Sequence, residues 1–238
     1  MRRVLVYQKR GSPQGGVLSP LIWILIMNTI LRQFHGTAIK VVGYADDILL
    51  LIAGPDKHTL AVLMNEALAK VLNWGKGHGL IFNPTKTCAV FFTKSNRIGK
   101  LTNLWMDGVK VKYDQSMKYL GVVLHRQLSW TEHCKERVSK AVKIVNLANA
   151  AIGQKWGFSP DRALWVYTAL ARSVATYGAI VWSVNITQTI QNMLNKLQRK
   201  AMLSMTSSMR STPTIGMEVV LGMLPLDLKA RNLSLIHI

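Results

Sequence analysis

The sequence predicts an α+β fold in two parts, with strands and helices over residues 1–128 and helices alone over residues 129–238. Two observations support this. Apolar runs rich in Val, Ile and Leu and bounded by Gly or Pro, such as Val41 to Ile52, are typical of strands. From Trp130 onward the spacing of apolar residues changes from two residues to 3.6 residues, which is the period of one helix face. A chain of 238 residues, 49% of them hydrophobic, can bury a substantial core.

The charge is strongly unbalanced. Thirty Lys and Arg residues face 11 Asp and Glu residues, which gives a formal net charge of +19. This imbalance predicts a polyanionic partner such as a nucleic acid. A ribosomal or chromatin protein shares that imbalance, but it has little use for seven Trp and 11 Met residues.

The remaining composition excludes several classes of protein. Cys88 and Cys134 lie far apart without metal-ligand spacing, so neither a disulfide framework nor a zinc site is indicated. The longest apolar stretch, Val17 to Leu31, is interrupted by polar residues and falls short of the roughly 20 residues that span a bilayer. We therefore expect no membrane segment and a reducing compartment. An intracellular, nuclear location is a separate expectation.

Two adjacent carboxylates interrupt the apolar run at its centre. We expect a hairpin with one strand near Val41 to Tyr44, a turn at Ala45 to Asp47 and a return strand from Ile48 to Ile52. The apolar flanks place Asp46 and Asp47 in a core, where carboxylates are costly unless they are paired or bind metal. Carboxylates on a rigid turn are hard ligands for Mg²⁺ or Mn²⁺. In the alternative interpretation these residues only form the turn.

Other local patterns complete the first part. Asp107-Gly108 predicts a hairpin, and Met117 to Leu124 reads from its residues alone as a strand whose glycine marks a bulge. The remaining expected elements are a strand at Val4–Gln8, a loop at Gly11–Gly16, a helix capped by Ser19 that runs to Phe34, a helix at Asp56–Trp74 ended by Gly75, Gly77 and Gly79, and a strand at Cys88–Thr93.

Four helices are expected in the second part, at Thr131–Ile152, Ser159–Trp182, Thr187–Met205 and Thr212–Gly222. Basic residues recur on the first and third of them. Such faces are typical of proteins that track a nucleic-acid backbone through phosphate contacts, although each of them alone also fits a solvated surface. The candidate backbone contacts are Lys135, Lys140, Lys143, Lys196, Arg199 and Lys200.

Two motifs carry a family resemblance. Tyr44-Ala45-Asp46-Asp47 resembles the Tyr-x-Asp-Asp hairpin of reverse transcriptases. The block Gly11 to Pro20, which contains Pro13-Gln14-Gly15, resembles the Pro-Gln-Gly block that precedes this hairpin by about 30 residues in the family. The resemblance implies a partial polymerase palm with an antiparallel sheet, followed by an all-α, thumb-like domain.

The resemblance also implies roles for residues. Asp46 and Asp47 would be the catalytic metal ligands in two-metal nucleotidyl transfer, with RNA template, DNA primer and deoxynucleoside triphosphates as partners. Lys86 would lie near the leaving pyrophosphate, although a lone Lys also fits a solvated charge. Nucleotide and template contacts would be Pro13, Gln14, Gly15, Tyr44 and Ala45, and the hairpin of Tyr119, Leu120 and Gly121 would hold the primer.

The second part narrows the family. Several of its motifs look like those of reverse transcriptases of non-LTR (LINE-type) retrotransposons, while a group II intron enzyme shares only the first blocks and ranks second. The motifs are Lys118-Tyr119-Leu120-Gly121, Leu128-Ser129-Trp130, His133, Tyr177-Gly178, Val181-Trp182, Leu197-Gln198-Arg199 and Met209 to Thr214.

One departure concerns activity. Palm polymerases use a third aspartate on a strand before the Pro-Gln-Gly block, and this chain has none between Met1 and Gly11. We therefore expect an N-terminally truncated enzyme fragment that is inactive alone. The alternative is a non-catalytic nucleic-acid-binding remnant of a retroelement. The sequence leaves open the oligomeric state and whether Leu233 to Ile238 is native.

Overall fold

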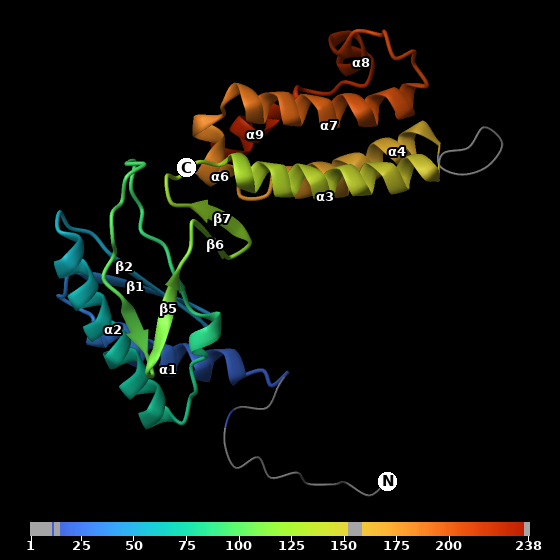
Figure 1. The fold of residues 1–238 in the computed structure, drawn as a ribbon. Coiled ribbons are helices and arrows are strands. Elements are labelled where there is room, and N and C mark those ends of the chain that lie inside the picture. Colours follow the sequence, from blue (N-terminus) through green and yellow to red (C-terminus); the bar gives the residue numbers. More distant parts are fainter. Residues whose placement is uncertain (1–10, 12–14, 152–158, 236–238) are drawn as a thin grey trace, which may run out of the picture. The chain divides into compact units, whose positions relative to one another are not determined.

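The structure, a computed structural model, describes residue 11 and residues 15–151 and 159–235. The chain forms two compact units (Figure 1), one of Met1–Ala89 with Ser95–Asp114 and the other of Val90–Lys94 with Gln115–Ile238. The predicted boundary between palm and thumb falls later, at residue 128. The hairpin of residues 116–125 thus belongs to the second unit by its contacts, while the functional boundary stays a prediction.

The described part of the first unit starts with two helices and the hairpin between them. Strands β1 and β2 pair antiparallel with Tyr44 opposite Asp47, so Ala45 and Asp46 form the turn. The elements are α1 (Ser19–Gln33), β1 (Ile39–Tyr44), β2 (Asp47–Ile52) and α2 (Lys57–His78).

The core of this unit lies on both sides of α2. On one side, Val71 and Trp74 pack with Ile30 of α1 and with the strands β1 and β2. On the other side, Leu68 packs with residues of β4 (Leu104–Met106) and β5 (Val109–Tyr113). The surface of α1 that no described residue covers is also apolar, because Leu21, Ile24 and Leu25 are each between 58% and 63% exposed.

The strands of this unit depart from the expected antiparallel sheet. The hairpin of β4 and β5 is antiparallel, but β3 (Cys88–Ala89) pairs parallel with β5. The strand expected to reach Thr93 ends at Ala89, because residues 90–94 leave the first unit for the second. There the Thr93 N–H donates to the Arg126 carbonyl at 3.0 Å.

The helix ends correct two details. Leu18, not Ser19, is the N-cap of α1, and it makes no side-chain capping hydrogen bond. Helix α2 starts at Lys57, one residue later than expected, and its N-cap is Asp56, whose carboxylate accepts the Thr59 N–H at 2.7 Å. It continues beyond Trp74 as far as Gly79, because the intervening glycines keep helical backbone and only Gly79 turns left-handed, with φ 68°.

The second unit combines a small hairpin with a helical bundle. Strands β6 (Ser116–Tyr119) and β7 (Val122–His125) pair antiparallel and lead into α3, which runs alongside α7 (Figure 1). The helical elements are α3 (Thr131–Ala150), α4 (Pro160–Val166), a π-helical turn η2 (Tyr167–Ala171), α5 (Arg172–Ala175), α6 (Ala179–Trp182), η3 (Ser183–Asn185), α7 (Gln188–Thr206), α8 (Thr214–Val220) and α9 (Leu226–Leu235).

The bundle differs from expectation in two places. The long helix expected to end at Trp182 is broken before α6, because Gly178 adopts left-handed backbone with φ 69°. Helix α9 was not expected, although Leu226, Ala230 and Ser234 recur at four-residue spacing and are buried. The strand expected at Val4–Gln8 lies outside the described residues.

Candidate functional site

The Asp pair lies at the tip of the β1–β2 hairpin. Asp47 is the first residue of β2, one residue earlier than expected, and Asp46 lies in the turn beside Ala45, whose φ is 50°. The Trp23 indole N–H donates to the Ala45 carbonyl at 2.6 Å and so ties α1 to this turn. The hairpin prediction is therefore confirmed.

The expected burial of the two carboxylates is wrong. Every residue from Gly43 to Asp47 is exposed, whereas Val41 and Leu50 in the middle of the hairpin pack against the core. The core covers the apolar residues in the middle of the two strands, and the turn lies beyond it. Because both carboxylates are exposed to solvent, the fold tolerates them without a partner. Only the fact that they are adjacent favours a cation at this turn.

The donor set fits a divalent ion in part. Asp46 and Asp47 supply two hard oxygen ligands, and Mg²⁺ accepts one or two carboxylates when waters and substrate phosphates complete its shell. Within the described ranges, no group of three or more His, Cys, Asp or Glu side chains is close enough to hold a metal. The turn thus presents two carboxylates side by side, and their role as metal ligands stays a prediction.

The other candidates near the nucleotide are placed only partly. Lys86 ends the short helix η1 (Pro84–Lys86) and is exposed. Gly15 is exposed with φ 83°, and Tyr44 is 60% exposed. Pro13 and Gln14 lie outside the described residues. The roles of these residues stay predictions.

The candidate primer hairpin is a true hairpin. Tyr119 pairs with Val122, which leaves Leu120 and Gly121 as a two-residue turn with φ values of 47° and 78°. The interpretation of this stretch as a single bulged strand is wrong, and the hairpin that the resemblance implied is present.

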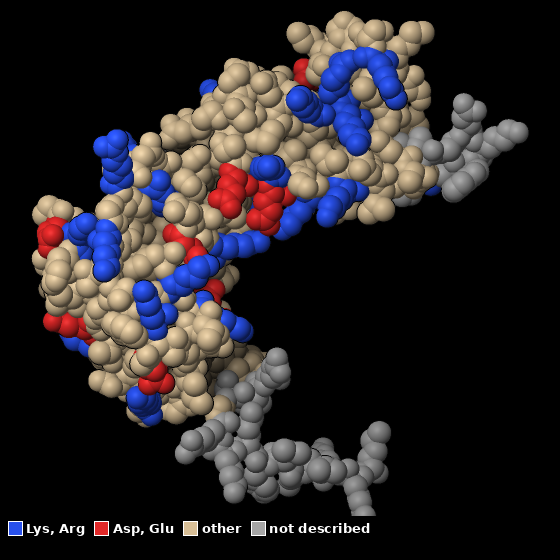
Figure 2. All heavy atoms as spheres, in the orientation of Figure 1, with Lys and Arg blue, Asp and Glu red and all other residues tan. Residues whose placement is uncertain are grey.

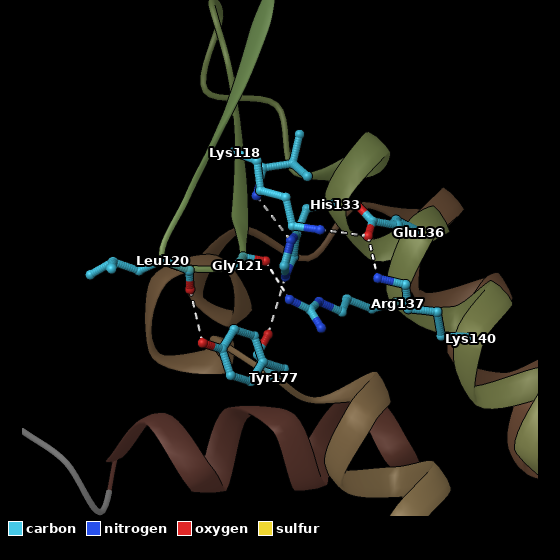
Figure 3. Close-up of polar contacts among 9 residues, drawn as sticks. Lys118, Leu120, Gly121, His133, Glu136, Arg137, Lys140 and Tyr177 are labelled. Carbon is cyan, nitrogen blue, oxygen red and sulfur yellow. Dashed lines mark hydrogen bonds and ion pairs between the residues drawn. The ribbon is translucent and has the colours of Figure 1, made fainter. Parts of the chain in front are cut away.

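Two side chains bind the carbonyls of this turn (Figure 3). The Tyr177 hydroxyl donates to the Leu120 carbonyl at 2.8 Å, and the Arg137 guanidinium donates to the Gly121 carbonyl. The same guanidinium lies over the Tyr177 ring, 4.2 Å from its centroid. Both carbonyls of the turn are therefore occupied within the chain.

A buried histidine links the hairpin to the same tyrosine. The Nδ1 atom of His133 accepts the Val123 N–H at 3.2 Å, so its proton resides on Nε2, which donates to the Tyr177 carbonyl at 3.1 Å. The Trp182 indole donates to that carbonyl as well, at 3.0 Å. Burial lowers the pKa of His133, which keeps the ring neutral and able to accept.

Beside this histidine, Glu136 is paired with two lysines. Its carboxylate lies 2.5 Å from the Lys140 ammonium and 3.1 Å from that of Lys118 (Figure 3). Hydrogen bonds from Lys140 and Lys118 lower the pKa of Glu136 to about 2. Lys140, a candidate backbone contact, is therefore already ion-paired within the chain.

The other basic candidates differ in availability. Lys135 and Lys143 of α3 and Lys196 and Lys200 of α7 are exposed, and Figure 2 shows basic side chains along α3 with acidic ones beside them. Arg199 is half-buried. It donates to the Thr212 carbonyl at 2.8 Å, the Thr214 hydroxyl at 2.7 Å and the Arg210 carbonyl at 2.6 Å.

The sequence alone indicates no role for Arg137, Tyr177 or Glu136. Two of them carry a signal in the sequence. Arg137 follows His133 by one helical turn and shares its helix face, and Tyr177 belongs to the Tyr177-Gly178 motif. No local pattern connects Tyr177 with Leu120, which lies 57 residues earlier, since that contact arises only from tertiary packing.

Comparison with known proteins decides the family. Residues 2–124, which are half of the chain, match the family described as "Reverse transcriptase (RNA-dependent DNA polymerase)". The chain belongs to the reverse transcriptase family. Its non-LTR character, expected from the motifs, is confirmed by the relatives that it resembles.

Three of these relatives come from insect elements. The chain is 27% identical over 224 residues to "Retrovirus-related Pol polyprotein from type-1 retrotransposable element R1" of Nasonia vitripennis, which covers 92% of the chain and 66% of the relative. It is 27% identical over 227 residues to "Putative 115 kDa protein in type-1 retrotransposable element R1DM" of Drosophila melanogaster, and this match covers 95% of the chain and 22% of the relative. It is 25% identical over 203 residues to "Probable RNA-directed DNA polymerase from transposon BS" of the same fly, and this match covers 83% of the chain and 22% of the relative.

This reverse transcriptase chain therefore spans between about a fifth and two thirds of the length of these relatives. No solved structure matches it. Within the described residues, no helix is both long and apolar enough to cross a bilayer.

Proposed function

We propose that this chain supplies the metal-binding hairpin and the primer-holding hairpin of a reverse transcriptase that copies RNA into DNA. The supporting observation is the Tyr-Ala-Asp-Asp turn, which is exposed at the tip of a hairpin and anchored to α1 by Trp23. In the reaction, the primer 3′-hydroxyl attacks the α-phosphate of a deoxynucleoside triphosphate, and pyrophosphate leaves.

Asp46 and Asp47 would hold Mg²⁺ or Mn²⁺ in this proposal. When bound, such ions stabilise the attacking and leaving oxygens of the transferred phosphoryl group. Lys86 would neutralise the pyrophosphate. The binding site for the nucleotide and the template would be lined by Pro13, Gln14, Gly15, Tyr44 and Ala45.

The second hairpin suits a phosphate of the primer. Tyr177 and Arg137 occupy the carbonyls of Leu120 and Gly121, and no described residue accepts a hydrogen bond from the N–H groups of these two turn residues. Backbone N–H groups in a turn favour anions. The turn is therefore suited to an acceptor such as a backbone phosphate. Exposed lysines of α3 and α7 would add attraction that is independent of sequence.

Residues 1–238 alone would not catalyse the reaction in this proposal, because two carboxylates leave the metal shell to be completed by other groups. The competing function is a nucleic-acid-binding protein without catalysis, which the net charge of +19 also favours. The two functions differ in the role of Asp46 and Asp47. In a polymerase their replacement lowers primer extension, whereas in a protein that only binds nucleic acid it affects no reaction.

Primer extension on an RNA template tests the proposal. It compares residues 1–238 with a longer chain that carries an additional upstream carboxylate strand, both in Mg²⁺. We expect only the longer chain to extend the primer, and Asp46→Asn or Asp47→Asn to lower its rate by about a hundredfold or more. Asp56→Asn is the matched control, since Asp56 caps α2 and asparagine also caps helices.

Two results would contradict this assignment. Full activity of the longer chain with Asp47→Asn would remove the turn from catalysis. Extension by residues 1–238 that Asp47→Asn abolishes would show that this chain already contains a complete site.

A further inference from the structure

The β6–β7 hairpin depends on residues outside itself for its orientation. It is a two-stranded sheet of four-residue strands, and such isolated hairpins are only marginally stable in water. Arg137 of α3 and Tyr177, which precedes α6, bind the carbonyls of its turn, and His133 of α3 binds the Val123 N–H in β7. We call these three residues the hairpin clasp.

The turn and the clasp approach each other as closely as a glycine permits. A Cβ atom on Gly121 would lie 3.0 Å from the Arg137 Nη2 atom and 3.2 Å from the Tyr177 Cε1 atom. The approach is reciprocal, because a Cβ on Gly178, the residue after Tyr177, would lie 3.1 Å from the Val122 Cγ2 atom. Two left-handed glycine turns, 57 residues apart, therefore pack against each other.

The three clasp residues are also connected to one another. Arg137 stacks on the Tyr177 ring, and His133 donates to the Tyr177 carbonyl while it accepts the N–H of Val123. The Leu120 side chain, 39% exposed, points away from all three (Figure 3). The clasp thus determines which face of the turn remains available to a ligand.

We propose that Arg137, His133 and Tyr177 are positioning residues, which hold the Leu120–Gly121 turn in the one orientation in which it contacts the primer. The proposal rests on the proposed function, since that function supplies the primer as ligand. Arg137 acts here through the Gly121 carbonyl and the Tyr177 ring rather than as a direct phosphate contact.

The test uses two matched variants of residues 1–238. Tyr177→Phe removes the hydroxyl that donates to the Leu120 carbonyl but keeps the ring beneath Arg137. Tyr113→Phe is the control, because the Tyr113 hydroxyl donates to the Thr102 carbonyl at 3.0 Å in the first unit. Each variant loses one hydroxyl and one hydrogen bond to a backbone carbonyl.

The first readout needs no nucleic acid. Amide hydrogen exchange of the segment 116–125 should rise roughly three- to tenfold in Tyr177→Phe, the effect of one lost hydrogen bond, and stay unchanged in Tyr113→Phe. Arg137→Lys is a second variant, which keeps the charge but loses the planar stack, and it should raise exchange in the same segment.

The second readout reports position. A photo-crosslinking amino acid at Leu120, whose side chain is free of the clasp, is irradiated in the presence of an RNA template annealed to a DNA primer. The unsubstituted clasp should yield crosslinks at one or two primer nucleotides. Tyr177→Phe should spread the crosslinks over several nucleotides while overall affinity stays within about twofold, and Tyr113→Phe should keep the narrow pattern.

The outcomes separate the clasp from the function. Unchanged exchange in both Tyr177→Phe and Arg137→Lys would overturn the clasp whether or not nucleic acid binds. Increased exchange with a crosslink pattern as narrow as before would overturn the positioning role. If exchange rises but the unsubstituted clasp yields no primer crosslink, the primer-holding function fails and the hold on the turn stands.

Discussion

The Arg137 guanidinium lies over the Tyr177 ring, and each of these two side chains donates to a carbonyl of the same two-residue turn. The two contacts share one side chain, because the ring beneath the guanidinium and the hydroxyl that binds Leu120 both belong to Tyr177. Residues in one such network are energetically coupled, so the effects of removing both should not add. The turn is therefore controlled from α3 and from the Tyr177–Gly178 bend at once.

Two glycines in similar turns should differ in their tolerance of alanine. Gly121 and Gly108 both follow the first turn residue of a hairpin, with φ values of 78° and 76°. A Cβ on Gly108 meets nothing within 4 Å, whereas on Gly121 it meets Arg137 and Tyr177. Gly108→Ala should cost about 1 kcal/mol of backbone strain, and Gly121→Ala about 1–3 kcal/mol more.

Local hydrogen exchange measures the two costs, over residues 104–113 in Gly108→Ala and over residues 116–125 in Gly121→Ala. Equal increases in the two hairpins would mean that only backbone strain matters and that the close approach to Arg137 is unimportant.

The buried histidine should make the second unit sensitive to mild acid. Its folded-state pKa is lowered by burial, so the unfolded chain binds the proton first as the pH falls below about 6.5. Stability should fall as the pH decreases through this range, by at most about 1.4 kcal/mol per pH unit. His133→Gln should remove this slope, because Gln can accept from Val123 and donate to Tyr177 without titrating.

Exchange of the α3 amides at pH 7.5, 6.5 and 5.5 measures the slope. The Glu136 pairs do not interfere, since its pKa of about 2 against an ordinary 4.5 places their loss below pH 4.5. Slopes that are identical in the two proteins would show that another group is responsible.

The basic residues of α7 should separate into two kinds. Replacing the exposed Lys196 and Lys200 by Ala should flatten the plot of log affinity for duplex against log salt by about one to two units, because each phosphate contact contributes about 0.9. Arg199→Ala should instead lower the melting temperature, since its donors hold the segment from Arg210 to Thr214.

Anisotropy of a labelled RNA–DNA duplex between 50 and 300 mM salt, roughly the range over which such slopes are read, gives the first value. A flatter plot in Arg199→Ala at unchanged melting temperature would make that residue a phosphate contact after all.

The Asp pair should be dispensable for folding. Both carboxylates are exposed, so Asp46→Asn and Asp47→Asn should each change the free energy of unfolding by less than about 0.5 kcal/mol. Asp227→Ala offers the contrast, because this buried carboxylate accepts from Gln191 at 2.8 Å and its loss should cost about 1–3 kcal/mol. Denaturant titrations compare the three. Strong destabilisation by Asp46→Asn would restore the idea of a buried, partnered pair.

The sequence predicted the hairpins where turn chemistry was local. The β-prone residues on both sides of Ala45-Asp46 and of Asp107-Gly108 identified both turns within a residue. The hairpin at Leu120-Gly121 was recognised only through family resemblance, because a leucine with φ 47° carries no ordinary turn signal. Its backbone is stabilised by α3 and Tyr177, and no local pattern encodes such tertiary support.

The exposure of the Asp pair was missed for a related reason. A run of apolar letters shows that a strand is covered, but it does not show where along the strand the cover ends. Here α1 and α2 cover the middle of the hairpin and leave its tip exposed. Likewise, the basic pattern of α7 could not distinguish Lys200, which is exposed, from Arg199, whose donors are used internally.

The two cysteines give each compact unit its own chemical reporter. Cys134 is buried in the core of the helical unit, where burial raises the pKa of its thiol to about 12, so it cannot react until that unit opens. Cys88 is exposed in the first unit and accessible to an alkylating reagent in the folded chain. Without any substitution, a probe can therefore be attached at Cys88. Separately, the rate at which Cys134 is alkylated measures how often the helical bundle opens.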